Sequence, residues 1–174
     1  MNLIKSLEWR YATKKFDDKR TLTEAQIHTL TNAFNLTATS YGLQPIKLVV
    51  VQNKETQQQL VAHSWNQQQV AQASHVLVIC IQENMTEQDI ETYFELVKKI
   101  RNTPDEVLTP FKEYLKADIT NKSDNELSLW MKNQAYIALG NLLTVAAIEQ
   151  IDSCPMEGFI PEKYDEVLGL KKYN

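Results

Sequence analysis

The sequence has 174 residues, of which 43% are hydrophobic and 23% charged, as is typical of a soluble globular protein that buries a core. Its formal net charge is −4, and no basic stripe is visible, which argues against nucleic acid as a partner. No apolar run is long enough to span a bilayer, and residues 1–8 lack a signal-peptide hydrophobic region, so we expect a cytoplasmic location and no membrane partner.

The first half of the chain predicts short helices that alternate with two buried strands. Thr23 and Gln26 have the spacing of a capping box, which marks the start of a helix. Two segments are nearly continuous apolar runs, as in a sheet that is covered on both faces. We expect helices at 2–9, 24–37 and 54–62, a loop at 38–45, and strands at 46–52 and 75–82.

The second half of the chain predicts mainly helices. Pro104 fits the first turn of one of them. Residues 136–148 are apolar nearly all round their helix, so we expect burial on all sides, in a monomer core or in an oligomer interface. Nothing marks a linker, which predicts one helix-rich α+β domain over residues 1–174. We expect helices at 86–101, 104–117, 124–150 and 161–168, a short strand at 151–154 and a turn at 155–158.

The common catalytic motifs are absent from the sequence. The three histidines are dispersed without metal-ligand spacing, so we expect no metal site. There is no nucleophile elbow, P-loop, dinucleotide glycine motif or CxxC pair. Cys80 and Cys154 lie in apolar surroundings, and we interpret them as small core residues in a reducing compartment. An enzyme with this sequence would therefore take its reactivity from a cofactor, with no catalytic side chain of its own.

A basic cluster follows the first predicted helix. Arg10, Lys14 and Lys15 surround Thr13 in the segment 10–16. These residues can bind a phosphate, because Arg offers a planar pair of donors, Lys a point charge and Thr a hydroxyl. On this pattern alone, the more common alternative is a solvated last turn that complements the helix dipole.

Four segments follow one another in the order of a known family. WRYATKKF (9–16) matches an opening basic motif, TATSYGLQPIKLVVV (37–51) a serine-rich loop with the first core strand, and ASHVLVIC (73–80) a second strand. The segment 130–159 ends in PMEGF and matches a long central helix followed by a Pro-x-Glu-Gly-Phe turn. Together they resemble the nitroreductase family over essentially the whole chain, and most of all its oxygen-insensitive nitroreductases and dihydropteridine-reductase-like members.

The resemblance implies a nitroreductase-like fold, with a central mixed β-sheet flanked by helices, and a homodimer with FMN at the subunit interface. Arg10 would bind the FMN phosphate. Lys14 would lie near the N1–C2=O side of the flavin ring, where a fixed cation stabilises developing negative charge. The whole segment expected to bind the cofactor is Arg10, Tyr11, Ala12, Thr13 and Lys14.

The resemblance also implies contacts from other segments. Asn66 would hydrogen-bond the pyrimidine edge of the ring, with Gln69 near it, and the Glu157–Gly158 turn would present backbone N–H groups to flavin N5 and O4. A plain loop turn is the alternative for that segment. Phe111 and Tyr114 would shape the substrate face, although aromatic residues at helical spacing are usually core. The remaining expected contacts are Thr39 and Ser40, from the second subunit, and Pro155 and Met156, against one ring face.

Three departures from the family pattern bear on cofactor affinity. Ala12 stands where the family usually has a serine, and a lost hydroxyl bond to a charged group costs about 1.5–3 kcal/mol. Gln69 stands where close relatives have a lysine near the ring. The family also continues beyond Asn174 with a strand, basic residues for the phosphate and a C-terminal arm, so we expect either an incomplete record or a truncated protein with weak FMN retention.

The activity that the resemblance implies is hydride transfer from NAD(P)H through flavin N5 to a small-molecule acceptor. The acceptor would be a nitroaromatic, a quinone or a pterin-type compound, reduced by a ping-pong mechanism. Two alternatives remain open. One is a non-catalytic or degenerate flavin-binding protein of the same fold, which Ala12 and Gln69 favour. The other is a small helical regulatory module that binds no cofactor.

Overall fold

The computed structural model describes residues 2–173, and the chain separates into two compact units. The first unit comprises Met1–Ala38, Leu48–Cys80 and Tyr136–Asn174, and the second comprises Thr39–Lys47 and Ile81–Ala135. The long helix α7 (Asp124–Ile148) begins in the second unit and ends in the first. The single domain over residues 1–174 that the sequence suggests stays a prediction.

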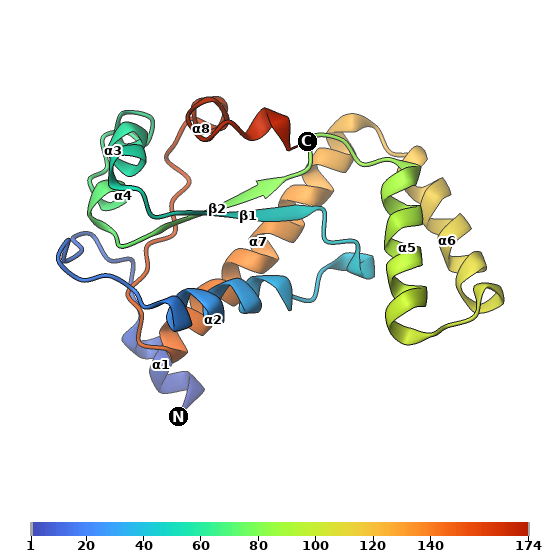
Figure 1. Cartoon of the computed structure of the whole chain (residues 1–174), viewed down its shortest axis with the longest axis horizontal. Helices are drawn as coiled ribbons and strands as arrows, with labels where there is room; N and C mark the ends of the chain where they lie inside the picture. Colours follow the sequence, from blue (N-terminus) through green and yellow to red (C-terminus); the bar gives the residue numbers. More distant parts are fainter. Residues whose placement is uncertain (1, 174) are drawn as a thin grey trace. The chain divides into compact units, whose positions relative to one another are not determined.

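The first unit contains most of a two-stranded antiparallel sheet and the helices that cover it (Figure 1). The α+β class is thus confirmed, although the sheet among the described residues is smaller than the mixed sheet expected. Six helices and a 3₁₀ turn belong to this unit in whole or in part. Its elements are α1 (Leu3–Trp9), α2 (Glu24–Asn35), β1 (Ile46–Val51), α3 (Lys54–Ala62), α4 (Gln69–Gln72), β2 (Val76–Ile81), the end of α7, α8 (Pro161–Leu168) and η2 (Leu170–Lys172).

Strand β2 has a different hydrophobic cluster on each face, because successive side chains of a strand point to opposite sides. Leu77 and Ile79 pack with residues of α2 and α7, including Leu30 and Leu142. The alternate positions of the strand pack with α3, α4 and α8. That second cluster comprises Leu60, Val61, Val70, Tyr164, Val76 and Val78, among others. The predicted sheet with two covered faces is therefore confirmed.

The second unit is built on two antiparallel helices and one apolar cluster. Its elements are η1 (Ser40–Gly42), α5 (Glu87–Arg101), α6 (Asp105–Thr120) and the start of α7. Asn102 ends α5 in the left-handed conformation, with φ 52°, and Pro104 is the N-cap of α6 rather than a residue of its first turn. The buried cluster consists of Met85, Ile90, Phe94, Leu115, Ile119, Leu127 and Met131.

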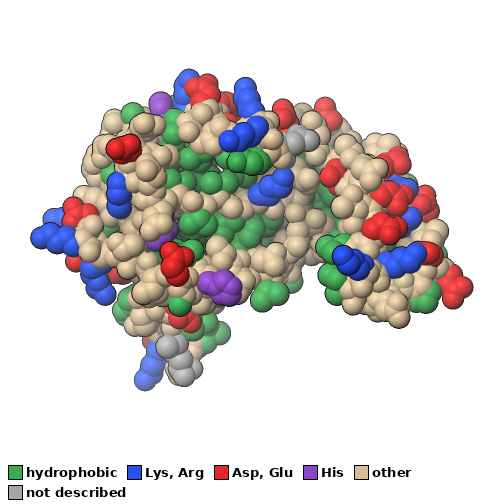
Figure 2. All heavy atoms as spheres, in the orientation of Figure 1, with side chains coloured by type: hydrophobic (Ala, Val, Ile, Leu, Met, Phe, Trp, Pro, Cys, Tyr) green, Lys and Arg blue, Asp and Glu red, His purple; other side chains and the backbone are tan. Residues whose placement is uncertain are grey.

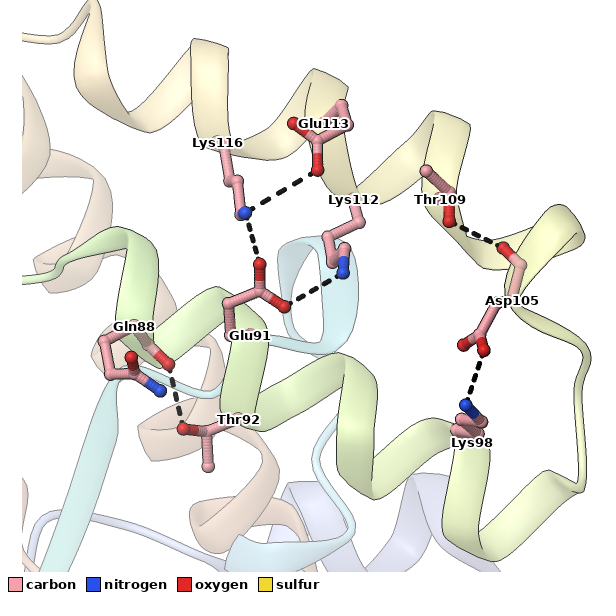
Figure 3. A network of polar contacts seen from close by, with 9 residues as sticks. All are labelled: Gln88, Glu91, Thr92, Lys98, Asp105, Thr109, Lys112, Glu113 and Lys116. Carbon is pink, nitrogen blue, oxygen red and sulfur yellow. Dashed lines mark hydrogen bonds and ion pairs between the residues drawn. The ribbon is translucent and has the colours of Figure 1, made fainter.

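Ion pairs cross the surface between α5 and α6. Glu91 pairs with Lys112 at 2.9 Å and also with Lys116, and Lys98 pairs with Asp105 at 2.6 Å (Figure 3). Acidic and basic side chains gather over these two helices in the space-filling view (Figure 2). The hydrogen bonds from Lys116 and Lys112 lower the pKa of Glu91 below its usual value.

Within this chain, the helical stretch 136–148 is not buried on all sides, because Tyr136 is 55% and Ile137 47% exposed, so of the two alternatives the oligomer interface stays a prediction. Cys80 and Cys154 are half-buried rather than in the core. The strand expected at 151–154 is reduced to a single parallel bridge between Ser153 and Ala12.

Candidate functional site

The basic segment after α1 lies along the segment that precedes the PMEGF turn. Ala12 and Ser153 form a parallel bridge, in which the Thr13 backbone N–H donates to the Ser153 carbonyl at 3.2 Å. The Thr13 side chain is 3% exposed, and its hydroxyl donates to Asp152 Oδ1 at 3.2 Å. This hydroxyl therefore fixes two distant segments together. It is already engaged within the protein, unlike the donor expected for a phosphate.

Arg10 has an unused donor beside this bridge. Its backbone caps α1 by donating to the Ser6 carbonyl at 3.2 Å, while its Nε is buried and has no acceptor among the described residues. A buried donor without an acceptor is costly, so such a group is suited to an anionic ligand. Lys14 is exposed and Tyr11 is 61% exposed, so neither is held by a packed environment.

The turn after α3 is tightly bent without any glycine. Trp65 has φ 53° and Asn66 has φ 59°, and the Asn66 N–H donates to the Val61 carbonyl at 3.1 Å. A left-handed residue other than glycine costs about 1–3 kcal/mol, and such strain is typical of ligand-binding segments. The turn presents Asn66 at the surface, and the Trp65 side chain is 73% exposed.

This turn packs against the PMEGF segment. A side chain at Gly158 would bring its Cβ to 2.6 Å from Trp65 Cε3, so any larger residue would require the indole ring to shift. Gln67 Nε2 donates to the Gly158 carbonyl at 3.1 Å, and the Ile160 N–H donates to the His63 carbonyl at 2.9 Å. The reason for glycine here is therefore close contact with Trp65.

The PMEGF segment presents backbone donors. Within residues 2–173, no acceptor takes the N–H of Met156, Glu157 or Gly158. The Glu157 carboxylate is engaged, because the Tyr136 hydroxyl donates to its Oε1 at 2.5 Å. This hydrogen bond to Glu157 also raises the pKa of Tyr136. The segment is thus tied to α7 through a side chain, while its amides stay available to a ligand.

Three of the expected groups of site residues therefore meet in the first unit. The segment 152–160 contacts the basic segment through Ser153 and the Trp65 turn through Gly158. Asn66 and Gln69 lie in and just after that turn, with Gln69 opening α4. The residues brought together are Arg10, Tyr11, Ala12, Thr13, Lys14, Asn66, Gln69, Pro155, Met156, Glu157 and Gly158.

The remaining expected residues lie in the second unit. The Ser40 N–H donates to Gln134 Oε1 at 2.8 Å, and Thr39 Oγ1 is buried without a partner among the described residues. The rings of Phe111 and Tyr114 are stacked, with centroids 6.4 Å apart. Both are exposed, by 43% and 56%, so they are not core aromatics. They are therefore accessible to a small molecule.

Three side chains that shape the site were not identified from the sequence. Trp65 covers Gly158, Gln67 binds the Gly158 carbonyl, and Tyr136 binds Glu157. Gln67 belongs to a glutamine-rich stretch that looks like ordinary polar surface, and Tyr136 belongs to an apolar helix. An aromatic residue directly before Asn66 was the one available signal.

Other kinds of site find no support in the described part of the chain. No group of three or more His, Cys, Asp or Glu side chains in residues 2–173 is placed to hold a metal ion. The helices described also include none that is long and apolar enough to cross a membrane.

Comparison with known sequences gives one consistent result. A sequence profile described as the Nitroreductase family matches residues 7–174. A Staphylococcus haemolyticus protein is 34% identical over 171 residues, which cover 95% of this chain and 78% of that protein. A Staphylococcus epidermidis protein is 37% identical over 172 residues, which cover 95% of this chain and 77% of that protein. Both are provisionally named NAD(P)H nitroreductases.

Solved structures share the fold. The nitroreductase ydfN of Bacillus subtilis superposes with a TM-score of 0.88 at 18% identity, over 96% of this chain and 80% of that chain. An Exiguobacterium sibiricum nitroreductase, solved in complex with FMN, gives a TM-score of 0.86 at 19% identity, over 97% of this chain and 80% of that chain. At these identities the likeness establishes the fold alone.

Proposed function

Because the chain belongs to the nitroreductase family, we propose that it is an FMN-dependent oxidoreductase that transfers hydride from NAD(P)H to a small-molecule acceptor. The observation that most supports this proposal is that an unused Arg10 Nε and the unused amides of Met156–Gly158 lie on two segments that the Ala12–Ser153 bridge joins. A cation and a row of N–H donors suit the two ends of FMN, which are a phosphate and a ring with acceptor atoms.

The residues present fit FMN. Arg10 would bind the phosphate, Asn66 the pyrimidine edge, and the amides of Glu157 and Gly158 the N5 and O4 side of the ring. Lys14 would stabilise negative charge near N1 and C2=O. Thr39 and Ser40 would contribute from the second subunit, and Pro155 and Met156 would cover one ring face.

When bound, FMN supplies the chemistry, by accepting hydride from NAD(P)H at N5 and passing it to a nitroaromatic, quinone or pterin-type acceptor in a ping-pong sequence. The protein contributes position and electrostatics. Phe111 and Tyr114 would form part of the surface that receives the acceptor. No side chain is required to act as an acid or a base.

A homodimer is part of this proposal. Helix α1 and the first-unit part of α7 expose apolar side chains that a second copy would cover, which supports an interface there. These side chains are Leu3 (48% exposed), Ile4 (60%), Leu7 (38%), Tyr136 (55%) and Ile137 (47%). Analytical ultracentrifugation is expected to give a dimer, and a monomer at micromolar concentration would contradict this part of the proposal.

The decisive experiment is FMN binding by the purified protein. We expect a yellow preparation, or uptake of added FMN with quenching of flavin fluorescence, followed by NADPH or NADH oxidation with a quinone acceptor. Arg10→Ala should weaken FMN binding about 10–100-fold, as loss of a charged hydrogen bond predicts. Arg101→Ala, which removes the same charge from an exposed position on α5, should leave binding unchanged.

A second candidate is a flavin-binding protein without turnover. The observation that favours it is the phosphate segment itself, where Ala12 offers no hydroxyl and the Thr13 hydroxyl is engaged by Asp152. FMN uptake without flavin-dependent NAD(P)H oxidation would favour this candidate. A colourless protein that takes up no FMN would contradict both. A cytoplasmic location is also proposed, since the two cysteines are not joined by a disulfide.

A further inference from the structure

Buried polar side chains flank both ends of the strained Trp65–Asn66 turn. At its start, Ser64 is fully buried, and its Oγ donates to the Leu60 carbonyl at 2.7 Å and lies 2.7 Å from the Tyr164 hydroxyl. Beyond its end, α4 comprises the four residues Gln69–Gln72. So short a helix has few hydrogen bonds of its own, and its last carbonyls need outside donors.

Gln57 of α3 supplies those donors from inside the core. Its side chain is 0% exposed, and its Nε2 donates to the Val70 carbonyl at 2.9 Å and to the Ala73 carbonyl at 2.8 Å. Its Oε1 is buried without a partner among the described residues. A buried side-chain amide whose oxygen accepts no hydrogen bond is costly. We therefore attribute the presence of Gln57 in the core to the two hydrogen bonds that its Nε2 donates.

Lys54 binds the same end of α4 from the surface. Its Nζ donates to the Ala71 carbonyl at 3.2 Å and to the Ala73 carbonyl at 2.6 Å. Lys54 is exposed, so water can replace these bonds. The Gln57 side chain is 0% exposed, so water cannot readily replace its bonds.

We propose that Gln57 is a positioning residue, which holds α4 so that the Trp65–Gln69 segment keeps its strained, ligand-ready conformation. Trp65 and Asn66 stand at positive φ, and a strained turn persists only where its surroundings fix it. Ser64 fixes one end and Gln57 the other. Gln57 itself does not reach the ligand, and it acts through α4 on Asn66 and Gln69. This inference rests on the proposed function, since it concerns the pyrimidine edge of FMN.

The test uses Gln57→Leu, which keeps the side-chain size and removes both donated bonds. The matched control is Asn141→Leu in the same unit. Asn141 Nδ2 likewise donates to two groups of another segment, to the Ala33 carbonyl of α2 at 2.8 Å and to Thr37 Oγ1 just beyond that helix at 2.9 Å. Both variants lose an amide that links two segments of the first unit, fully buried at Gln57 and half-buried at Asn141, so both should lower the melting temperature. Only Gln57→Leu should affect the Trp65–Gln69 segment.

Two measurements separate positioning from general support. Hydrogen exchange of the protein without FMN should show faster exchange over residues 64–73 in Gln57→Leu and wild-type exchange there in Asn141→Leu. FMN titration well below the melting temperature should show about tenfold weaker binding in Gln57→Leu, with a shifted flavin reduction potential, and neither change in Asn141→Leu.

Each outcome decides between the claims. If Gln57→Leu binds FMN with wild-type affinity and potential, the positioning role is overturned, even if the melting temperature falls. If exchange over residues 64–73 is unchanged, the inference fails as well. If the wild type binds no FMN, the proposed function is wrong, and the predicted effect of Gln57 on FMN binding is wrong with it. Hydrogen exchange then still decides whether Gln57 orders residues 64–73. Loss of binding in both variants would show a general stability effect and overturn the specific role.

Discussion

The two compact units both contain apolar clusters, but the polar contacts that link their helices differ. In the first unit, polar side chains cross between elements, as Gln57 does from α3 to α4 and Asn141 from α7 to α2. In the second unit, an apolar cluster joins the helices, and the polar links between α5 and α6 are ion pairs such as Glu91 with Lys112, whose side chains are 32% and 22% exposed.

The difference follows from what each kind of contact can fix. A buried hydrogen bond is directional and costly to leave unmade, so it defines the position of a backbone segment. An exposed ion pair is screened by salt and tolerates many geometries. The unit with the Arg10, Asn66 and Gly158 segments is the one with the fully buried Gln57 and Ser64 side chains and their hydrogen bonds. Variants in the two units can test this contrast.

The largest effect is expected from cavities in the two cores. Leu60→Ala in the first unit and Leu115→Ala in the second each remove a side chain that is 0% exposed, and each should lower the free energy of unfolding by about 2–5 kcal/mol. Leu60→Ala should also weaken FMN binding, because Leu60 lies on α3 shortly before the Trp65 turn and packs in one cluster with Val70 of α4. Urea denaturation followed by circular dichroism and FMN titration measure the two effects. If Leu115→Ala weakened FMN binding as much as Leu60→Ala, the two units would not differ in their support of the site.

A buried hydrogen bond gives the next largest effect. Ser64→Ala leaves the Tyr164 hydroxyl, in a side chain that is 6% exposed, without its 2.7 Å partner. The free energy of unfolding should fall by about 1–3 kcal/mol. Thr120→Ala removes a comparable hydroxyl from an exposed site on α6. This change should alter the free energy of unfolding by no more than about 0.5 kcal/mol. Equal losses in the two variants, in parallel urea titrations, would count against a special role for burial.

The third effect is a pH dependence confined to the first unit. Burial lowers the pKa of His75 below its usual value, Lys54 lowers it further, and Glu24 opposes both. The unfolded chain therefore takes up a proton on this residue at a higher pH than the folded protein does. The contribution of neutral His75 to the free energy of unfolding is fully present above about pH 6.5. It is lost as the pH falls through the lowered pKa. Unfolding free energies of wild type and His75→Asn between pH 7.5 and 5 should diverge by this loss, and parallel curves would disprove it.

The smallest effect belongs to the second unit. Glu91→Gln removes the ion pairs with Lys112 and Lys116 and should lower the melting temperature slightly at low salt. It should not lower it in 1 M NaCl, where the Debye length is only about 3 Å. Glu113→Gln is the control, because its single contact with Lys116 is 3.6 Å long. A large fall that persists in high salt would show that these pairs fix the helices as firmly as buried hydrogen bonds do.

Much of the fold was predictable from local patterns. The Thr23–Gln26 capping box is present, and the apolar runs form the two strands at Ile46–Val51 and Val76–Ile81. These signals are local, so they depend little on what packs around them. The order of the four family-like segments also led to the right family, because order and spacing along the chain are properties of the sequence alone.

The sequence could not show which residues support the site. Gln57 and Gln67 belong to glutamine-rich stretches, and nothing local distinguishes a buried amide from a solvated one. The left-handed turn at Trp65 and Asn66 contains no glycine, so the usual signal for positive φ was absent. Tyr136 and Ile137 were expected to be buried because they are apolar, yet exposure is decided by the neighbours that an element has in the fold.

The bridge between Ala12 and Ser153 has a consequence for how the protein is made. Thr13 and Asp152, which bond beside it, are 139 residues apart in the chain. Contacts of such long sequence separation form late, because a large loop must close first. During synthesis the Arg10 segment leaves the ribosome early and must wait for residues 152–158 before its partner exists. A ribosome-bound chain that ends before residue 152 should therefore fold its early helices without acquiring the Arg10–Gly158 arrangement.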